Sequence, residues 1–135
     1  MARRPLPPLA CVLSFIDAVN MGDLDRLRSL MSDDHRLVVL AEEPLVGRAA
    51  NTDAWHGYFS SFPNYVIEPR FLVADGPRVA VLGTTTGSHL GLADDEERRL
   101  GVIWLAEVDG GRLSSWHILD DTADERERLD IPPPV

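Results

Sequence analysis

The chain has 135 residues, of which 44% are hydrophobic and 26% are charged, and this composition predicts one globular domain with a single core. The formal net charge of -9 argues against nucleic acid and against an anionic membrane surface as partners, because both repel a negatively charged protein. Cys11 is the only cysteine, so an intramolecular disulfide is excluded.

Both ends of the chain are expected to lie outside the domain. Three early prolines interrupt the continuous apolar run that an export signal needs, so residues 1–8 are predicted to be the flexible N-terminus of a cytoplasmic protein. Residues 130–135 form a Pro-rich tail that can be neither helix nor strand. Residues 9–129 contain no internal repeat and no boundary, and nothing in them is long and apolar enough to cross a membrane.

Three helices are predicted in the first half of the chain, because apolar residues recur there at helical spacing. The first covers residues 9–20, the second follows Asp23 as its N-cap, and the third covers about 48–61. A short strand at 35–40 separates the second helix from the third. Its alternation places His35 on the apolar face of the strand.

Four strands are predicted in the second half, where β-branched and aromatic residues lie between turn signals. They cover residues 65–74, 79–89, 100–108 and 113–119. Pro69 indicates that the first is an edge strand or carries a bulge. The charged run 93–99 is expected to be a solvated connection, and 122–129 a short helix that opens with a capping box.

Helices grouped before a series of antiparallel strands indicate an α+β fold. The predicted arrangement is a strongly curved antiparallel sheet wrapped around three N-terminal helices, which makes a cone with one open end.

The register of the last hairpin determines which side chains share a face of the sheet. Gly110-Gly111 is typical of a two-residue turn with positive φ. A regular hairpin then pairs Asp109 with Arg112 and Trp104 with His117. Directly opposed side chains lie on the same face of a sheet, so the sequence predicts an indole and an imidazole together inside the cone.

His117 is therefore the first candidate for a catalytic acid or base, and His35 is the second. An imidazole exchanges a proton near neutral pH because its pKa starts near 6.5, as is usual for His. A buried histidine that only packs in the core is the alternative explanation for each. The candidates for substrate contact are Trp104, Tyr58, Trp55, Thr85, His89 and Phe15.

Metal and cofactor motifs are not apparent in this sequence. The four histidines have no His-x-x-x-His spacing and no carboxylates clustered beside them. No Gly-rich phosphate loop or dinucleotide fingerprint is present, so neither a metal nor a cofactor is expected.

A series of short motifs runs through residues 9–121. They are Asn20–Leu24, Asp33-Asp34, Gly47-Arg48, Phe62-Pro63-Asn64, Gly83–Gly87 and Gly111–Leu113 followed by Trp116. In this order they resemble the nuclear transport factor 2-like superfamily, and within it the SnoaL-like and ketosteroid-isomerase-like branch. The resemblance implies a cystatin-like α+β barrel with a deep apolar pocket, and often a homodimer formed through the outer sheet face.

The resemblance also bears on the chemistry. Thr85 occupies the position of a catalytic His in SnoaL-like cyclases, and Trp104 that of its partner Asp. The expected function is a cofactor-free enzyme of the cyclase, isomerase or dehydratase type, acting on an apolar substrate such as a polyketide or another natural product. The alternative is a non-catalytic module of the same fold that binds a hydrophobic ligand or a protein.

Overall fold

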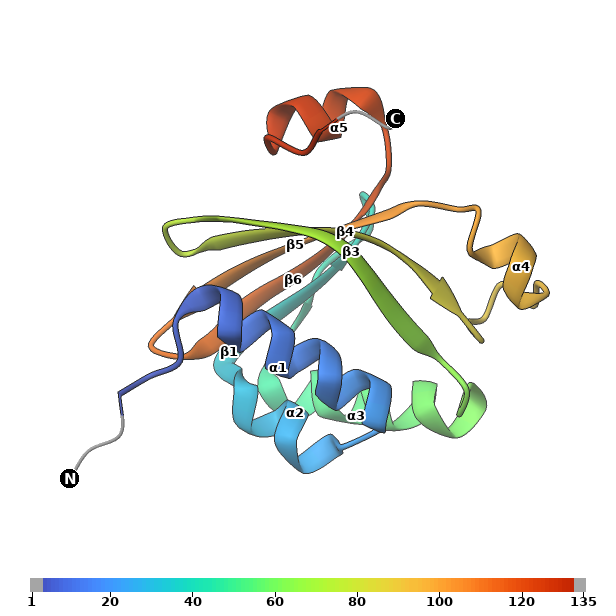
Figure 1. The fold of residues 1–135 in the computed structure, drawn as a ribbon. Coiled ribbons are helices and arrows are strands. Elements are labelled where there is room, and N and C mark those ends of the chain that lie inside the picture. Colours follow the sequence, from blue (N-terminus) through green and yellow to red (C-terminus); the bar gives the residue numbers. More distant parts are fainter. Residues whose placement is uncertain (1–3, 133–135) are drawn as a thin grey trace.

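The computed structural model describes residues 4–132, in which helices lie on both sides of a curved six-stranded sheet (Figure 1). The elements in chain order are α1 (Pro8–Met21), α2 (Leu24–Leu30), β1 (Met31–Val39), β2 (Leu45–Val46), α3 (Arg48–Ser61), β3 (Val66–Asp75), β4 (Arg78–Thr86), α4 (Asp94–Glu97), β5 (Val102–Asp109), β6 (Arg112–Asp120) and α5 (Ala123–Arg128). The predictions for the two chain ends fall partly on residues 1–3 and 133–135, which lie outside the described range.

The predicted α+β fold is confirmed. The strand order is β2-β1-β6-β5-β4-β3, and every neighbouring pair is antiparallel except β1 with β6, which is parallel. β3 is an edge strand with a register shift between Pro69 and Phe71, so proline has both of its expected effects there. α1, α2 and α3 cover the concave face of the sheet (Figure 1).

Local signals explain where the first helices begin and end. α1 stops at Gly22, whose φ of 64° allows its N–H to bond back to the carbonyls of Ala18 and Val19. The side chain of Asp23 then accepts a hydrogen bond from the N–H of Arg26 and starts α2, as predicted. β1 follows directly from Met31, four residues earlier than the strand predicted at 35–40.

The main core fills the space between α1 and the concave face. The apolar stripe of α1 is buried as its spacing predicts, and it contains Val12, Phe15, Ile16 and Val19. From the sheet, Trp104 and Trp116 are fully buried against it.

The last part of the described chain covers the opposite, outer face. α5 lies on the convex side of the sheet (Figure 1), and its Thr122 cap accepts a hydrogen bond from the N–H of Glu125. Ile131 is only 4% exposed and packs with Ala80 and Ile103 in a second, smaller core. The segment predicted as a free tail therefore begins with a buried anchor.

Candidate functional site

The predicted pairing of Trp104 with His117 is wrong. Asp109 does face Arg112 across the turn, but Ser114 is an extra residue that makes a bulge in β6. Beyond this bulge Trp104 pairs with Ile118, and His117 pairs with Leu105.

His117 consequently lies on the outer face of the sheet, away from the interior of the cone. Its Nε2 is 3.0 Å from the carbonyl oxygen of Leu40 and bonds to it. The inward residues Leu113, Trp116 and Ile118 are three and then two positions apart, and this change of parity was the sequence signal for the bulge.

Trp104 and Phe15, two candidates for substrate contact, belong to the core. The ring of Trp104 stacks on Trp116 with centroids 6.1 Å apart, and the ring of Phe15 lies 4.9 Å from the same indole. Both side chains are at most 1% exposed. Neither is among the residues that line the chamber described below.

His35 faces inward as predicted but is sealed in the core. Its Nδ1 is 2.7 Å from the carbonyl oxygen of Leu113, so Nδ1 carries the hydrogen and donates it. Its Nε2 is buried and has no hydrogen-bond partner among the described residues. Burial lowers the pKa of His35, against the opposing effects of the Leu113 carbonyl and of Asp34, and this favours the neutral ring.

The chamber itself is an apolar cavity of about 210 Å³ at the open end of the cone. It lies between α3 and the ends of β1 and β6, and the segments before β3 and after β4 complete its wall. Its lining residues are Leu37, Val39, Ala54, Trp55, Tyr58, Tyr65, His89 and Ile118. Three of the predicted contact residues, Trp55, Tyr58 and His89, are thus brought together there.

The polar part of this wall is a phenol–imidazole pair. The hydroxyl oxygen of Tyr58 is 2.9 Å from Nδ1 of His89, and the backbone N–H of His89 donates to the same oxygen over 3.2 Å. Burial raises the pKa of Tyr58; the bond from the His89 N–H opposes this effect, and the nearby charge of Glu97 adds to it. The phenol is therefore protonated at neutral pH and is a hydrogen donor.

Tyr65 is the second phenol in the wall. Its ring meets that of Tyr58 edge to face with centroids 4.9 Å apart. Burial raises its pKa as well, and the charges of Tyr58 and Glu97 act in the same direction. Two protonated phenols, those of Tyr58 and Tyr65, therefore line the apolar cavity.

Glu97 is the polar residue near this wall that sequence reasoning missed. The run 93–99 was expected to be solvated, but it forms α4, and the side chain of Glu97 is 1% exposed. The hydroxyl of Thr85 donates to its Oε2, and the N–H of Ser88 lies 3.4 Å from its Oε1. α4 has only four residues, too few for a periodic pattern to reveal which one is buried.

Thr85, the remaining predicted contact residue, faces inward but is tied to this carboxylate. It is 7% exposed and belongs to the same sheet face as Val81 and Ile67. Its hydroxyl donates a hydrogen bond to Glu97. Thr85 is not among the residues that line the cavity.

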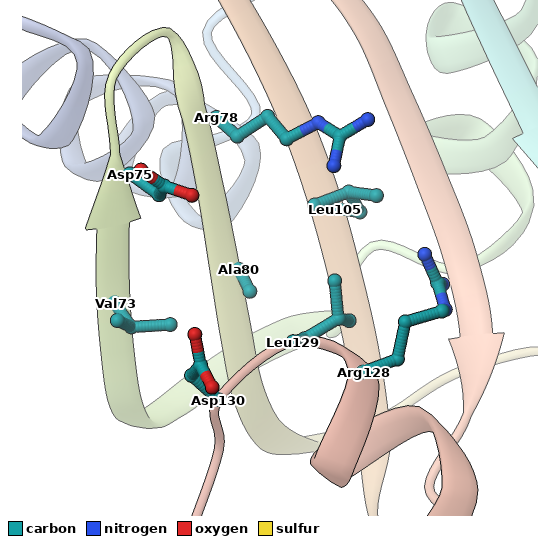
Figure 2. A pocket seen from close by; sticks show the side chains of 8 residues that line it. All are labelled: Val73, Asp75, Arg78, Ala80, Leu105, Arg128, Leu129 and Asp130. Atoms are coloured by element: carbon teal, nitrogen blue, oxygen red, sulfur yellow. The ribbon is translucent and has the colours of Figure 1, made fainter.

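A second cavity lies on the other side of the sheet, under the C-terminal segment. Figure 2 shows Leu129 between this segment and the outer face of β4 and β5, with Arg78, Arg128, Asp75 and Asp130 around it. Its volume is about 50 Å³. An apolar cavity of about 150 Å³ holds benzene, and this space is far smaller, so it suits water and not an organic ligand.

Two further structural features concern the described residues as a whole. Within residues 4–132, no three His, Cys, Asp or Glu side chains come together as a metal site would require. No helix of the same range combines the length and apolar character of a membrane span.

Comparison with known proteins gives the family. No curated protein matches the chain. Among solved structures, similar folds include an uncharacterised cystatin-fold protein from Novosphingobium aromaticivorans, with 19% identity, a TM-score of 0.73, and coverage of 84% of this chain and 98% of that one. A candidate SnoaL-like polyketide cyclase from Jannaschia sp. CCS1 has 17% identity, a TM-score of 0.69, and coverage of 98% and 99%.

A third structure, a candidate ketosteroid isomerase from Kribbella flavida, has 24% identity, a TM-score of 0.66, and coverage of 93% of this chain and 89% of its own. At these identities the likeness establishes the fold alone. The sequence profile of the SnoaL-like domain matches residues 12–116, which is most of the described range. The chain therefore belongs to the SnoaL-like domain family, within the nuclear transport factor 2-like superfamily.

Proposed function

We propose that this protein is a small-molecule enzyme of the cyclase, isomerase or dehydratase type, in which Tyr58 and His89 act on a carbonyl oxygen of an apolar substrate. The observation that carries the proposal is the hydrogen-bonded phenol–imidazole pair in the wall of the 210 Å³ apolar cavity. Similar structures described as a polyketide cyclase and a ketosteroid isomerase support a substrate of polyketide or related natural-product type. In this proposal Tyr58 and His89 supply the hydrogen bonds to the substrate oxygen, and no cofactor takes part.

The pair works as a polarised proton donor. The oxygen of Tyr58 accepts the backbone N–H of His89, and in one tautomer it also accepts Nδ1–H from the same residue. Both bonds draw electron density from the phenol, which makes its own O–H a stronger donor to a substrate oxygen. His89 is exposed at the mouth of the cavity, so its ring can exchange protons with water.

The donor matters because negative charge develops on the carbonyl oxygen when a neighbouring C–H bond breaks. A hydrogen-bond donor fixed at that oxygen stabilises the enolate-like transition state more than the ketone. The apolar remainder of the wall removes water and orients the hydrocarbon body of the substrate. These two effects suit isomerisation, cyclisation and dehydration equally.

A bicyclic ketone tests the proposal. A cavity of about 150 Å³ holds benzene, so the larger cavity here suits 1-tetralone. In D₂O, buffer base takes the C2 proton of bound tetralone while Tyr58 donates a hydrogen bond to the oxygen of the resulting enolate. The deuterated buffer acid then gives a deuteron to C2, which restores the ketone. We expect the protein to accelerate deuterium incorporation at C2, measured by NMR, and Tyr58→Phe to reduce this acceleration about a hundredfold or more.

Tetralin, which lacks the oxygen, is the matched ligand, and calorimetry compares the affinities of the two. We expect tetralone to bind more tightly than tetralin to the wild type and equally to Tyr58→Phe. Tight binding without deuterium incorporation contradicts the enzyme and supports the alternative, a module that only binds hydrophobic ligands. Absence of binding contradicts both.

We also propose that the protein works as a cytoplasmic homodimer. The C-terminal segment occupies the outer face over β3 to β5, where Leu129 and Ile131 pack. The remaining outer face, over β1 and β6, carries half-buried Val38 and His117 opposite one another. This remaining part is the surface proposed for pairing.

A further inference from the structure

The buried carboxylate of Glu97 is not explained by stability. Burying an ionised carboxylate costs several kcal/mol unless a cation pairs with it, and none of the ion pairs in the described range includes Glu97. The three acidic residues before it on α4 are all exposed. Because no cation offsets this cost, the hydrogen bonds of the carboxylate are what hold it in its buried position.

The contacts of Glu97 are directed at the segment that carries His89. Its Oε2 accepts from the hydroxyl of Thr85, which lies at the end of β4, and its Oε1 faces the N–H of Ser88. Ser88 directly precedes His89. The carboxylate therefore ties the end of β4 to the turn that follows it.

The turn also has two bonds of its own, from the N–H groups of Leu90 and Gly91 to the hydroxyl and the carbonyl of Ser88. Gly87 and Gly91 both have φ of 68°, and His89 and Leu90 between them are exposed. On one side the turn packs closely: a Cβ on Gly87 would lie 2.3 Å from the carbonyl oxygen of Asn64, next to Tyr65. On the other side, the anchor is Glu97.

We propose that Glu97 is a positioning residue of the pocket, whose carboxylate holds the turn so that the ring and backbone N–H of His89 both meet the hydroxyl of Tyr58. This inference rests on the proposed function, because it assigns the support of the same phenol–imidazole pair. Glu97 does not line the cavity and contacts no substrate.

The charge of Glu97 has a second effect on the same pair. It raises the pKa of Tyr58 and of Tyr65, in addition to the larger effect of burial. The titratable groups that face Tyr58 are Tyr65 before β3, His89 after β4 and Glu97 on α4. Arg98, the cation next to Glu97, is bonded to Glu68.

The test replaces Glu97 with Gln, which keeps the size and polar atoms of the side chain but removes its charge. Glu96→Gln is the matched control, since it removes the same charge from an exposed position on the same helix. The chain has only two tyrosines, so ¹³Cζ-tyrosine NMR gives two signals, and Tyr65→Phe identifies the signal of Tyr58. This measurement needs no substrate.

We expect Glu97→Gln to weaken the nuclear Overhauser contact between Tyr58 and His89. It should also raise the pH at which Tyr58 titrates, because the bond from the His89 N–H lowers the pKa of Tyr58 by more than the charge of Glu97 raises it. Glu96→Gln should leave both at their wild-type values. Deuterium incorporation into tetralone should fall in Glu97→Gln towards the rate of Tyr58→Phe, and stay unchanged in the control.

A folded Glu97→Gln protein with the titration and contact of the control overturns the inference. If Glu97→Gln does not fold, Thr85→Val provides the second variant, because it removes one of the two donors to the carboxylate while the charge remains. It should weaken the Tyr58–His89 contact, and an unchanged contact likewise overturns the inference. If the NMR effects appear but tetralone neither binds nor exchanges, the positioning role stands and the proposed enzyme fails.

Discussion

At the scale of single residues, His35 shows how burial controls the charge of an imidazole. The side chain is 0% exposed, and one ring nitrogen bonds to the Leu113 carbonyl while the other has no partner in the described range. Protonating this ring in the folded protein would place a cation among Phe15, Trp116 and their neighbours. The lowered pKa of His35 expresses that cost.

This cost predicts a pH dependence of folding. Because the pKa of His35 is lower in the folded protein than the usual value of about 6.5, the unfolded chain binds its proton first as the pH falls. The free energy of unfolding should therefore decrease below about pH 6.5 and continue to fall until the folded protein also takes up the proton. Urea unfolding at a series of pH values measures the effect.

His35→Asn is the comparison variant, since its amide can still donate to the Leu113 carbonyl but does not titrate. The difference in unfolding free energy between wild type and His35→Asn should shrink as the pH falls from about 7 to 5. A difference that stays constant over this range would mean that His35 keeps an ordinary pKa in the core.

At the scale of elements, the bulge in β6 decides which side chains the chamber receives. The extra residue Ser114 lies between Leu113 and Ser115, which pair with adjacent residues of β5. Because of it, Trp116 and Ile118 face inward and His117 faces outward. A hairpin of the same sequence without the bulge would exchange those faces.

The bulge gives a prediction for two single-residue deletions. Deleting Ser114 leaves Val108 opposite Leu113 and Glu107 opposite Ser115, so the strand becomes regular and every later side chain keeps its face. We expect this variant to fold and to retain the near-UV circular dichroism of the buried tryptophans. Deleting His117 should unfold the protein, because Ile118 and the residues after it change faces.

α4 illustrates a different limit of sequence patterns. Its four residues are all acidic, and only the last is buried. Whether such a residue meets solvent or the protein depends on how the connection between β4 and β5 folds back over the sheet, and that path is set by contacts with Thr85 and Ser88. The element that supports the proposed site is thus the one with the weakest local signal.

At the scale of the whole molecule, the two faces of the sheet are covered by different parts of the chain. The concave face holds the core and the cavity, whereas α5 and Ile131 cover the part of the convex face over β3 to β5 (Figure 1). The proposed dimer would use the part of the convex face that is left, over β1 and β6.

The proposed dimer therefore has a specific weak point. Val38→Arg places a charge in the centre of the remaining outer face, where burial of an unpaired cation is costly. Light scattering should give twice the mass of one chain for the wild type and the mass of one chain for the variant. Ala41→Arg, which adds the same charge in an exposed turn, should remain a dimer. A wild-type protein with the mass of one chain contradicts the proposal.

The sequence by itself determined most of the elements, although not β2 or α4, and the family. Helical spacing predicted the buried stripe of α1, Asp23 and Thr122 predicted two helix starts, and Pro69 predicted an irregular edge strand, because these signals act within a few residues of chain. Tyr58, Trp55 and His89 were also identified as candidates that the structure brings to one cavity.

Only the tertiary structure decided how these elements combine into a site. One unpaired residue, Ser114, moved His117 out of the chamber, since the side-chain period of a strand is two and a single insertion reverses it. Tyr58 and His89, which bond to one another, lie 31 positions apart in the chain. Glu97 lies 12 positions from Thr85, which donates a hydrogen bond to its buried carboxylate. Such contacts depend on the packing of separate elements, and no local pattern encodes them.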